Sequence, residues 1–507
     1  MRGLKNIYNP PFCGGRYILT PPPPKTPRIN GPAVFGVRPG APFLFTIPAS
    51  GERPMSFSAK GLLKGLRVDE NTGRITGRIE SVEKKSSAVT LRAFNRHGRA
   101  EKRLRIAVGD DVCLTPPLGW NSWNAWGQRI DREKALASAR AMVEKGLINH
   151  GWTYVNIDDG WQGTRGGPYH AIQPDPEKFS DMVKMCDTLH SLGLKAGIYS
   201  TPWITTYAGR AGGSSDSPAG VWEAKRDGRK QRVFGKYGFH RQDARQWAEW
   251  GIDYLKYDWY PNDLVSVRRM AKALRECGRD IVYSISSQAP LRNTGTVRKH
   301  ASCWRTTGDL KDRWNAAGPG LNMVEVWNRH REWLEKGGGG GPGHFPDADM
   351  LVVGPVIEDN ASETPRPSRL TPDEQYTHIS LWALWSSPML IGCPVEMMDE
   401  FTVGLLINDE VLAVHQDPAG FPGKTVFNED NSEIIVKKLS DGSVACGLFN
   451  RHDEARMVTA GWDLIGLSGE RRLRDIWRQK DIGTYDRRFS ARVRPHGTIL
   501  IRAMRAN

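Results

Sequence analysis

Residues 251–260, Gly-Ile-Asp-Tyr-Leu-Lys-Tyr-Asp-Trp-Tyr, carry reactive side chains at the end of an apolar stretch. The pattern over 253–257 predicts a short strand, with Asp258 directly after it. Pro261-Asn262-Asp263 ends that strand and caps the helix that follows. If such strand–helix units repeat into a parallel barrel, Asp258 and Lys256 lie at the rim where catalytic residues gather. A surface aspartate at a strand–loop junction is the alternative, and the number of repeats decides between them.

Strand and helix patterns alternate from about residue 114 to residue 415. One predicted helix is capped by Asp131, another by the capping box Thr371-Pro372-Asp373-Glu374, and a third carries Phe179, Met182, Val183 and Cys186 on one face. Eight units favour a closed (β/α)₈ barrel over an open doubly wound sheet, which would carry a glycine-rich phosphate turn. The glycine run 337–341 lacks a Lys-Ser/Thr partner and is predicted to be a loop. The predicted strands are 118–123, 154–157, 195–200, 253–257, 281–284, 303–306, 350–353 and 389–391.

Both flanks of the barrel have β patterns. We divide the chain into a proline-rich lead-in (1–30), a small β domain (31–112), the barrel (113–415) and a C-terminal antiparallel β-sandwich (416–507). The overall fold class is therefore α/β, with a TIM barrel between two β domains.

Charge and cysteine content exclude several classes of partner and cofactor. The 507 residues include 71 Lys and Arg against 56 Asp and Glu, a formal charge of +15. This could suit nucleic acid or an acidic glycan, but no basic arm, zinc-finger spacing or recognition motif is present, so we expect no nucleic-acid partner. Seven scattered cysteines without a Cys-x-x-Cys pair indicate buried thiols and no zinc site. The sequence gives no indication of the oligomeric state.

No apolar run reaches the roughly 18 residues that a membrane span needs, so we expect no membrane partner. Arg2 and Lys5 are not followed by the apolar segment of a signal peptide. Either the chain stays inside the cell, or its signal is missing from this sequence.

Polar side chains also follow the other predicted strands. They are Asp158-Asp159-Gly160-Trp161, Tyr199 with Ser200, Lys256 with Asp258, and Arg305 with Asp309. Buried charges are costly unless they are paired or used, so this convergence indicates an active site that binds a polyol. The 18 tryptophans suit a protein that stacks rings on sugars, although core packing explains many of them equally well.

The sequence combines paired carboxylates with aromatic walls and shows no metal triad. This combination is what glycoside hydrolysis needs. One ionised carboxylate attacks the anomeric carbon, and one protonated acid releases the leaving oxygen. Lys256 beside Asp258, and Arg305 near Asp309, would help to keep one carboxylate ionised.

Six motifs in order resemble the signatures of glycoside hydrolase family 27, the α-galactosidase (melibiase) family. The similarity extends from about residue 114 to the end. The motifs are Gly119-Trp120-Asn121-Ser122-Trp123, Asn156-Ile157-Asp158-Asp159-Gly160-Trp161, Leu194-Lys195-Ala196-Gly197-Ile198-Tyr199-Ser200, Tyr254-Leu255-Lys256-Tyr257-Asp258, Trp304-Arg305-Thr306-Thr307-Gly308-Asp309 and Asp347-Ala348-Asp349-Met350-Leu351.

This resemblance implies a retaining exo-glycosidase that hydrolyses terminal α-linked D-galactose without a cofactor. It makes Asp258 the nucleophile and Asp309 the general acid/base. The paired aspartates would take the 4- and 6-hydroxyls of galactose. The residues implied to bind the sugar are Trp123, Asp158, Asp159, Tyr199, Lys256, Arg305 and Asp349. For Trp123 and Tyr199, simple core packing is the alternative.

The chain departs from the family pattern in two places. Tyr207 and Tyr260 stand where members often have a disulfide, which predicts that they, with Trp203 and Trp259, reshape the pocket wall. Ser286-Ser287-Gln288 replaces the segment that usually reads the sugar's 2-substituent, so the contact to that position is open.

The N-terminal β domain resembles the immunoglobulin-like module of a bacterial subgroup whose members are usually exported, which favours secretion or a periplasmic location. Three rival functions stay open. The barrel could cleave β-L-arabinopyranosides or an α-glucan such as dextran, or the chain could be a non-catalytic carbohydrate-binding protein. The third rival is a binder of nucleic acid or an acidic glycan driven by the +15 charge, which would lose affinity steeply with salt.

Overall fold

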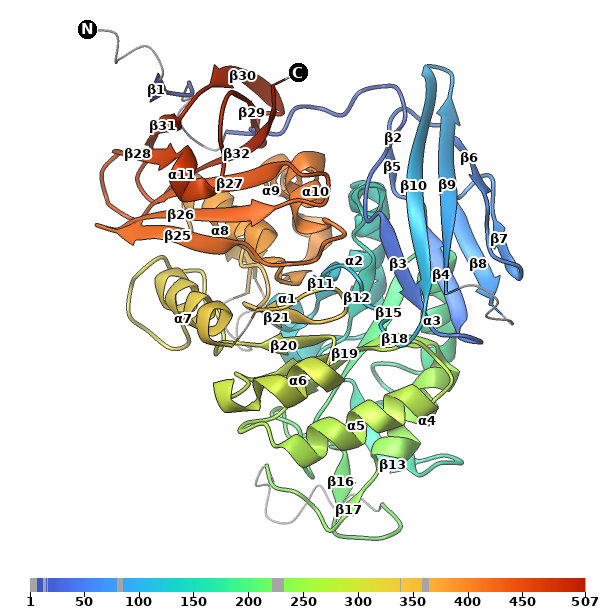
Figure 1. Ribbon diagram of the computed structural model, residues 1–507. Coiled ribbons are helices and arrows are strands. Elements are labelled where there is room, and N and C mark those ends of the chain that lie inside the picture. The colour runs from blue at the N-terminus through green and yellow to red at the C-terminus, as the bar shows by residue number, and fades with distance from the viewer. Residues whose placement is uncertain are drawn as a thin grey trace, which may run out of the picture.

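The structure is a computed structural model that describes residues 7–11, 15, 17–79, 85–220, 232–337, 339–357 and 364–506 (Figure 1). Cys13, the basic N-terminal residues Arg2 and Lys5, and Gly338 of the glycine run lie outside these ranges. Across the described ranges, no helix is long and apolar enough to cross a bilayer.

An eight-stranded parallel sheet forms the barrel, in the order β21-β20-β19-β18-β15-β12-β11-β24. A parallel bridge between Leu351 and Ile391 joins its two edges. The strands are β11 (Leu118–Asn121), β12 (Tyr154–Asn156), β15 (Lys195–Ser200), β18 (Ile252–Asp258), β19 (Val282–Ser286), β20 (Cys303–Arg305), β21 (Phe345–Asp347) and β24 (Met389–Ile391). The predicted (β/α)₈ fold is confirmed.

The prediction for the seventh strand is wrong. The apolar run 350–353 is not a strand, and β21 lies just before it. Asp349 has a φ of 91°, which turns the chain out of the ladder, and Leu351 then makes only the closing bridge. Burial, not pairing, accounts for the apolar character of this run.

Helices surround the sheet. They are α1 (Trp123–Trp126), α2 (Arg132–Glu144), α3 (Met182–Ser191), α4 (His240–Trp250), α5 (Leu264–Glu276), α6 (Thr294–His300), α7 (Met323–Lys336), α8 (Pro372–Trp385), α9 (Glu400–Leu406) and α10 (Asp409–His415). Asp131 caps α2 and Asp263 caps α5 as predicted, and the capping box at Thr371 starts α8. The third predicted helix starts later than its pattern suggests, because Asp181 is the N-cap of α3 and Phe179 precedes it.

Short elements line the loops between these units. They are the hairpins β13 (Gln162–Gly166) with β14 (Ala171–Pro174), β16 (Ser214–Ser215) with β17 (Tyr237–Gly238), and β22 (Pro355–Val356) with β23 (Arg366–Pro367), and the 3-10 turns Gly127–Arg129, Leu147–His150, Leu291–Asn293 and Val395–Met397.

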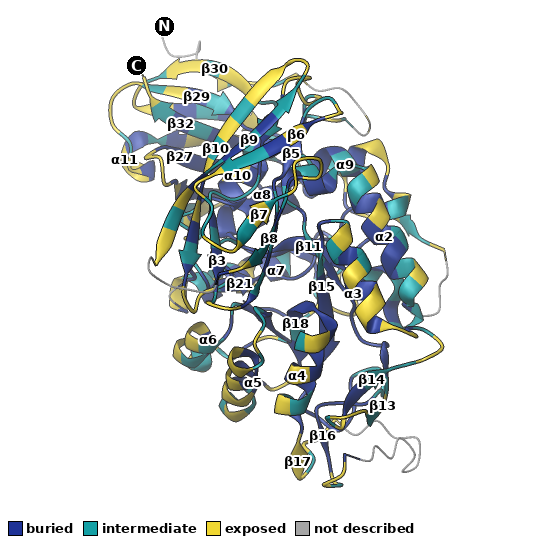
Figure 2. Ribbon diagram, turned by 90° about the vertical axis from the view of Figure 1, so that its right-hand side faces the viewer, coloured by how far each residue is buried: buried dark blue, intermediate teal, exposed yellow. Residues whose placement is uncertain are grey.

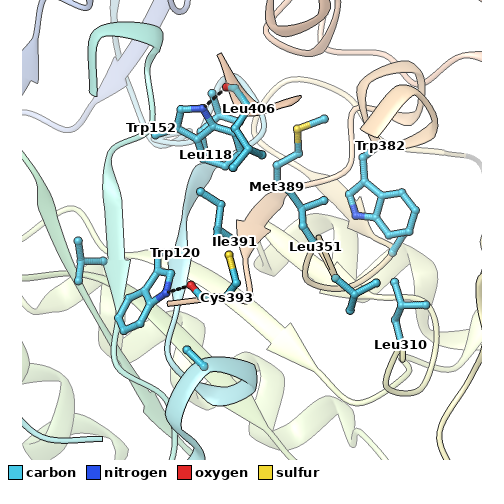
Figure 3. Close-up of a cluster of buried hydrophobic side chains, with 14 of the residues drawn as sticks. Leu118, Trp120, Trp152, Leu310, Leu351, Trp382, Met389, Ile391, Cys393 and Leu406 are labelled. Carbon is cyan, nitrogen blue, oxygen red and sulfur yellow. Dashed lines mark hydrogen bonds between the residues drawn. The ribbon is translucent and has the colours of Figure 1, made fainter. Parts of the chain in front are cut away.

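Tryptophans fill the core more than they line the site. Ten of the tryptophans that the structure describes are fully buried, so most of the tryptophan content serves packing. The indole N–H of Trp120 donates to the Cys393 carbonyl at 2.8 Å, and that of Trp152 donates to the Leu406 carbonyl at 2.8 Å (Figure 3). These bonds satisfy the polar edge of each ring inside an apolar cluster.

The N-terminal domain is a small β-sandwich. One sheet has the order β3-β10-β9-β6 and the other β4-β8-β7, with the pair β2-β5 beside them. The strands are β2 (Arg28–Ile29), β3 (Val34–Val37), β4 (Pro42–Thr46), β5 (Ala49–Ser50), β6 (Ser56–Lys60), β7 (Leu66–Val68), β8 (Arg74–Arg78), β9 (Ser86–Asn95) and β10 (Gly98–Val108). This domain lies against the amino ends of the barrel strands, since Thr46 bonds the Gly193 carbonyl just before β15 and Arg38 pairs with Asp280 just before β19.

The C-terminal domain has a six-stranded sheet, β25-β26-β27-β32-β29-β30, and a three-stranded sheet, β1-β31-β28. Ile7–Tyr8 of the lead-in forms β1 and pairs in parallel with β31. The other elements are β25 (Lys424–Glu429), β26 (Ser432–Lys438), β27 (Val444–Asn450), β28 (Arg456–Gly461), α11 (Trp462–Ile465), β29 (Arg471–Asp475), β30 (Lys480–Tyr485), β31 (Arg488–Val493) and β32 (Thr498–Arg505).

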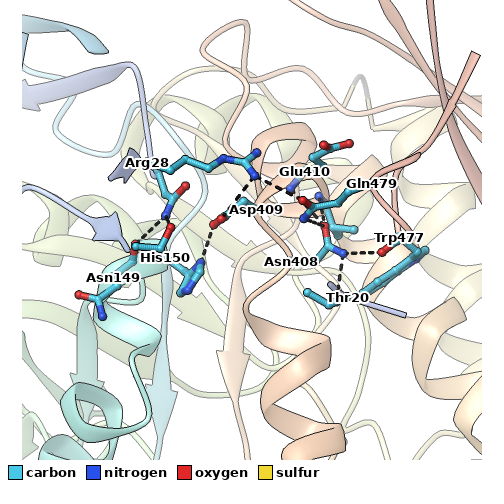
Figure 4. Close-up of polar contacts among 12 residues, drawn as sticks. Thr20, Arg28, Asn149, His150, Asn408, Asp409, Glu410, Trp477 and Gln479 are labelled. Atoms are coloured by element: carbon cyan, nitrogen blue, oxygen red, sulfur yellow. Dashed lines mark hydrogen bonds and ion pairs between the residues drawn. The ribbon is translucent and has the colours of Figure 1, made fainter. Parts of the chain in front are cut away.

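A polar junction joins the three domains to the lead-in (Figure 4). Asp409 of α10 pairs with His150 of the barrel and, at 3.8 Å, with Arg28 of β2, which packs with the N-terminal β domain. Asn408 donates to Thr20 of the lead-in at 3.0 Å and to the Trp477 carbonyl of the C-terminal domain at 2.9 Å. The domains therefore pack as one body.

Candidate active site

The nine predicted site residues all lie at the carboxyl ends of the barrel strands or in the loops that follow. Trp123 comes after β11, Asp158 and Asp159 after β12, Tyr199 in β15, Lys256 and Asp258 in β18, Arg305 at the end of β20, Asp309 after it, and Asp349 after β21. Eight of them line one cavity of about 430 Å³. Arg305 is buried behind that wall and pairs with two of the lining carboxylates.

Asp258 is one of the buried carboxylates of the cavity, with 8% of its surface exposed. The Tyr199 hydroxyl donates to one of its oxygens at 3.1 Å, and the Ser287 hydroxyl donates to the other. Burial raises the pKa of Asp258, and Lys256 and the Ser287 hydrogen bond oppose that rise. Two fixed donors leave the carboxylate oriented in the cavity.

Asp309 is the exposed carboxylate, with 67% of its side chain open to solvent. Partial burial raises its pKa, but the Arg305 guanidinium at 3.3 Å, with Lys256 and Lys311, outweighs it and holds the pKa of Asp309 below the usual value. The two candidate catalytic groups thus differ in both access to water and charge environment.

Asp349 is fixed by three donors. Arg305 pairs with one oxygen at 2.7 Å, and the backbone N–H groups of Met350 and Leu310 donate at 2.7 and 2.8 Å. Asp349 therefore anchors Arg305 and the loop that carries Asp309.

The paired aspartates after β12 differ from each other. Asp158 accepts from Lys256 at 2.7 Å, and this ion pair with Asp258 nearby raises the pKa of Lys256 despite burial. One oxygen of Asp159 accepts from the Ala208 N–H at 2.7 Å, while the other is buried with no protein partner in the described structure. Burial raises the pKa of Asp159 to about 7. The unpaired oxygen is a ready partner for a ligand hydroxyl.

Ser287 and Gln288 are cavity residues whose role the sequence leaves open. Both have positive φ, 67° and 45°, although neither is glycine. Such strain persists where the surroundings impose it, and here it directs the Ser287 hydroxyl at Asp258. The sequence does not predict this hydrogen bond, since neither serine nor glutamine favours a positive φ.

Tyr207 and Tyr260 both line the cavity, as predicted from the missing disulfide. Trp203 packs edge-on against Tyr207, with ring centroids 5.3 Å apart. Tyr260 is 57% exposed at the rim. Trp259 is instead fully buried and donates to Asp263, so it supports the wall from behind. Asn124, Leu310 and Met350 also line the cavity and were not predicted.

Among the residues that the structure describes, no group of three or more His, Cys, Asp or Glu side chains could hold a metal ion. The cavity offers five carboxylates, one lysine and several hydroxyls; the carboxylates are Asp158, Asp159, Asp258, Asp309 and Asp349.

Three family models match the chain in succession. Alpha galactosidase A matches residues 115–219 and 226–417, and the alpha galactosidase C-terminal beta sandwich domain matches 429–503. A provisionally defined Ig domain matches 26–109.

Characterised relatives and solved structures agree with these matches. Alpha-galactosidase 2 of Arabidopsis thaliana is 34% identical over 77% of this chain and 90% of its own length. A crystal structure from Bacteroides fragilis, provisionally assigned as an alpha-galactosidase/melibiase, is 33% identical, with a TM-score of 0.82 over 94% of this chain and 98% of its own. A family 27 β-L-arabinopyranosidase from Geobacillus stearothermophilus is 26% identical, with a TM-score of 0.65 over 78% of this chain and 98% of its own. The chain therefore belongs to the alpha-galactosidase A family, glycoside hydrolase family 27.

Proposed function

We propose that the protein hydrolyses terminal α-D-galactosides with retention of configuration, with Asp258 as nucleophile and Asp309 as general acid/base. The observation that carries this proposal is the pairing of a buried, doubly hydrogen-bonded carboxylate with an exposed one in a single cavity. Family membership supplies the substrate class, since the named relatives are alpha-galactosidases.

In the first step a carboxylate oxygen of Asp258 attacks the anomeric carbon and forms a covalent glycosyl ester. The bond to the leaving oxygen breaks, and Asp309 gives that oxygen its proton. Asp309 suits this part because it lies at the open mouth, where an aglycone must leave. Tyr199 and Ser287 hold Asp258 in line for attack.

In the second step Asp309, now ionised, takes a proton from water. The water oxygen attacks the anomeric carbon, and the ester bond to Asp258 breaks with its electron pair returning to the carboxylate. Two inversions give a product with the configuration of the substrate.

The inner wall of the cavity binds the sugar. The unpaired oxygen of Asp159 accepts one hydroxyl, and the Asp158–Lys256 pair offers both an acceptor and a donor to others. Trp123 presents its ring to the apolar side of the sugar.

The test compares an aryl α-D-galactopyranoside with an aryl β-L-arabinopyranoside as substrates, following the first product anomer by NMR. We expect α-galactose first. Asp258→Ala should lose at least about 10⁴-fold in kcat and regain turnover with azide, giving β-galactosyl azide. Asp187→Ala, an exposed carboxylate of α3, is the control and should be unchanged.

Each other outcome refutes a part of the proposal. β-Galactose as first product would show inversion, and wild-type rates in Asp258→Ala would remove the nucleophile. A preference for the arabinoside, the named substrate of the Geobacillus relative, would keep the mechanism and change the sugar.

A further inference from the structure

The positive charge of the chain is concentrated in one domain. Residues 26–109 contain 16 Lys and Arg and 6 Asp and Glu, so this segment carries +10 of the formal +15. The catalytic barrel and the C-terminal domain together are close to neutral by comparison. A charge that is concentrated in this way calls for a local explanation.

Much of this charge lies on one face of a sheet. One side of β9 and β10 faces the domain core, with Val89, Leu91, Leu104 and Ile106 buried on it. The alternate residues therefore face solvent. Strand pairing sets the outward residues in rows: Arg105 and Ala88; Arg103, Thr90 and Lys60; Glu101, Arg92 and Ser58; Arg99, Phe94 and Ser56. We call these residues the basic face.

The cations of the basic face are available for a ligand. Arg99, Arg103, Arg105 and Lys60 are exposed, and none of them pairs with a carboxylate in the part of the chain that the structure describes. Only Arg92 has such a partner, Glu101 at 2.9 Å. Neighbouring strands are about 4.8 Å apart and alternate residues about 7 Å apart, so these side chains form a two-dimensional array.

The other members of the face are small. Ser56, Ser58, Ala88 and Thr90 leave the surface between the arginines low, and Phe94 adds one half-exposed ring. Figure 2 shows β9 and β10 at the surface with exposed residues along them, and Figure 1 shows both strands extending upward beyond the barrel strands. An extended chain could therefore lie across these exposed strands.

We propose that the basic face binds an acidic polysaccharide, a glycan that carries carboxylate or sulfate groups along its length. Arginine pairs with such groups in a planar, bidentate way, and several pairs along one polymer add up. The N-terminal domain, which carries this face, lies at the amino ends of the barrel strands, whereas the cavity opens at their carboxyl ends. The face therefore tethers the enzyme to an acidic matrix while the cavity remains free to act on galactosyl ends.

The choice of a glycan as the polyanion rests on the proposed function of the barrel. An enzyme that trims terminal galactose gains from being held on the material that carries it. The face also lacks the recognition helix or aromatic platform of several rings with which nucleic-acid domains read bases.

The test measures binding of the full chain to polygalacturonate by thermophoresis at 50 and 300 mM NaCl. The variant R99S/R103S/R105S removes three cations of the face. The matched control R456S/R488S/R492S removes three exposed arginines from β28 and β31, so both proteins have the same net charge. Neutral galactomannan is the ligand control, and hydrolysis of an aryl α-galactoside reports folding of each variant.

We expect the face variant to weaken polygalacturonate binding at least tenfold and to show a smaller dependence on salt, and the control variant to change it less than twofold. Equal losses in both variants would mean that net charge alone acts, and absence of binding to polygalacturonate would remove the ligand. Tighter binding of duplex DNA than of polygalacturonate would make the face a nucleic-acid surface. Aryl galactoside hydrolysis is scored separately, so failure here leaves the proposed reaction standing, and the reverse holds as well.

Discussion

At the residue scale, the pKa values of the two candidate catalytic carboxylates, Asp258 and Asp309, are shifted in opposite directions. Burial raises the pKa of Asp258, and Arg305 holds that of Asp309 below its usual value. If this order persists when the pair shares one proton in the free enzyme, that proton lies mainly on Asp258, whereas the proposed reaction needs Asp258 ionised and Asp309 protonated.

This order gives a pH prediction for Ser287→Ala. The Ser287 hydroxyl favours the ionised form of Asp258, so its removal raises the pKa of Asp258 further. The profile of kcat/KM reports the free enzyme, and with Asp258 as the group of higher pKa the alkaline limb follows it. We expect that limb to move up by about 0.5–1 pH unit and the maximum of kcat/KM to fall, since one hydrogen bond contributes about 0.5–1.5 kcal/mol. The measurement is kcat/KM from pH 3 to 9.

Ser287→Thr, which keeps a hydroxyl, is the matched variant and should restore the wild-type limb. A shift of the acid limb in Ser287→Ala would mean that Asp309 has the higher pKa. No shift of either limb would mean that Ser287 does not influence the nucleophile.

Asp159 links the site to stability. Its pKa is raised from 3.8 to about 7, so the folded state binds more protons than the unfolded state between these values. The free energy of unfolding therefore falls as pH rises through this window, by up to about 4 kcal/mol. Asp159→Asn mimics the protonated form and should raise the free energy of unfolding at pH 8 while changing it little at pH 4. Urea unfolding at the two pH values measures this, and equal effects at both would contradict it.

At the element scale, much of the barrel follows from periodicity. Seven of the eight strands were predicted within one or two residues, and the polar tips of those strands converge as parallel topology requires. The strand order and the convergence of the strand ends follow from the repeating strand–helix pattern, so both can be predicted from a single sequence. The predicted catalytic and sugar-binding residues follow from strand ends together with the family motifs.

Other features depend on tertiary context. The apolar run at 350–353 has the composition of a strand, and only the turn at Asp349 removes it from the ladder. The hydrogen bond from Ser287 to Asp258 depends on backbone strain in two consecutive residues that no propensity favours. Lys437, the penultimate residue of β26, would be expected from sequence to be solvated, yet it is 1% exposed.

At the scale of the whole molecule, Lys437 joins the C-terminal domain to the barrel. Its ammonium group donates to the Ala383 carbonyl of α8 at 3.1 Å, to the Val414 carbonyl of α10 at 2.6 Å and to the Ser386 hydroxyl at 2.7 Å. These carbonyls lie in the last turns of their helices and need donors. One side chain of the sandwich thus caps two helices of the barrel.

Burial lowers the pKa of Lys437 from 10.5 to about 7, so between these values the unfolded state binds the extra proton and stability from this residue rises with pH. Lys437→Met removes both the donors and this dependence. We expect it to destabilise the protein by about 1–3 kcal/mol at pH 7, from carbonyls left unpaired, and by more at pH 9 than at pH 6.5.

Lys438→Met, the exposed neighbour on the same strand, is the control and should change stability by less than about 0.5 kcal/mol. Chemical unfolding at the three pH values measures both variants. A cost that is the same at pH 6.5 and 9 would mean that Lys437 keeps its charge in the folded state, and equal behaviour of the two variants would mean that the domains are held by apolar contact alone.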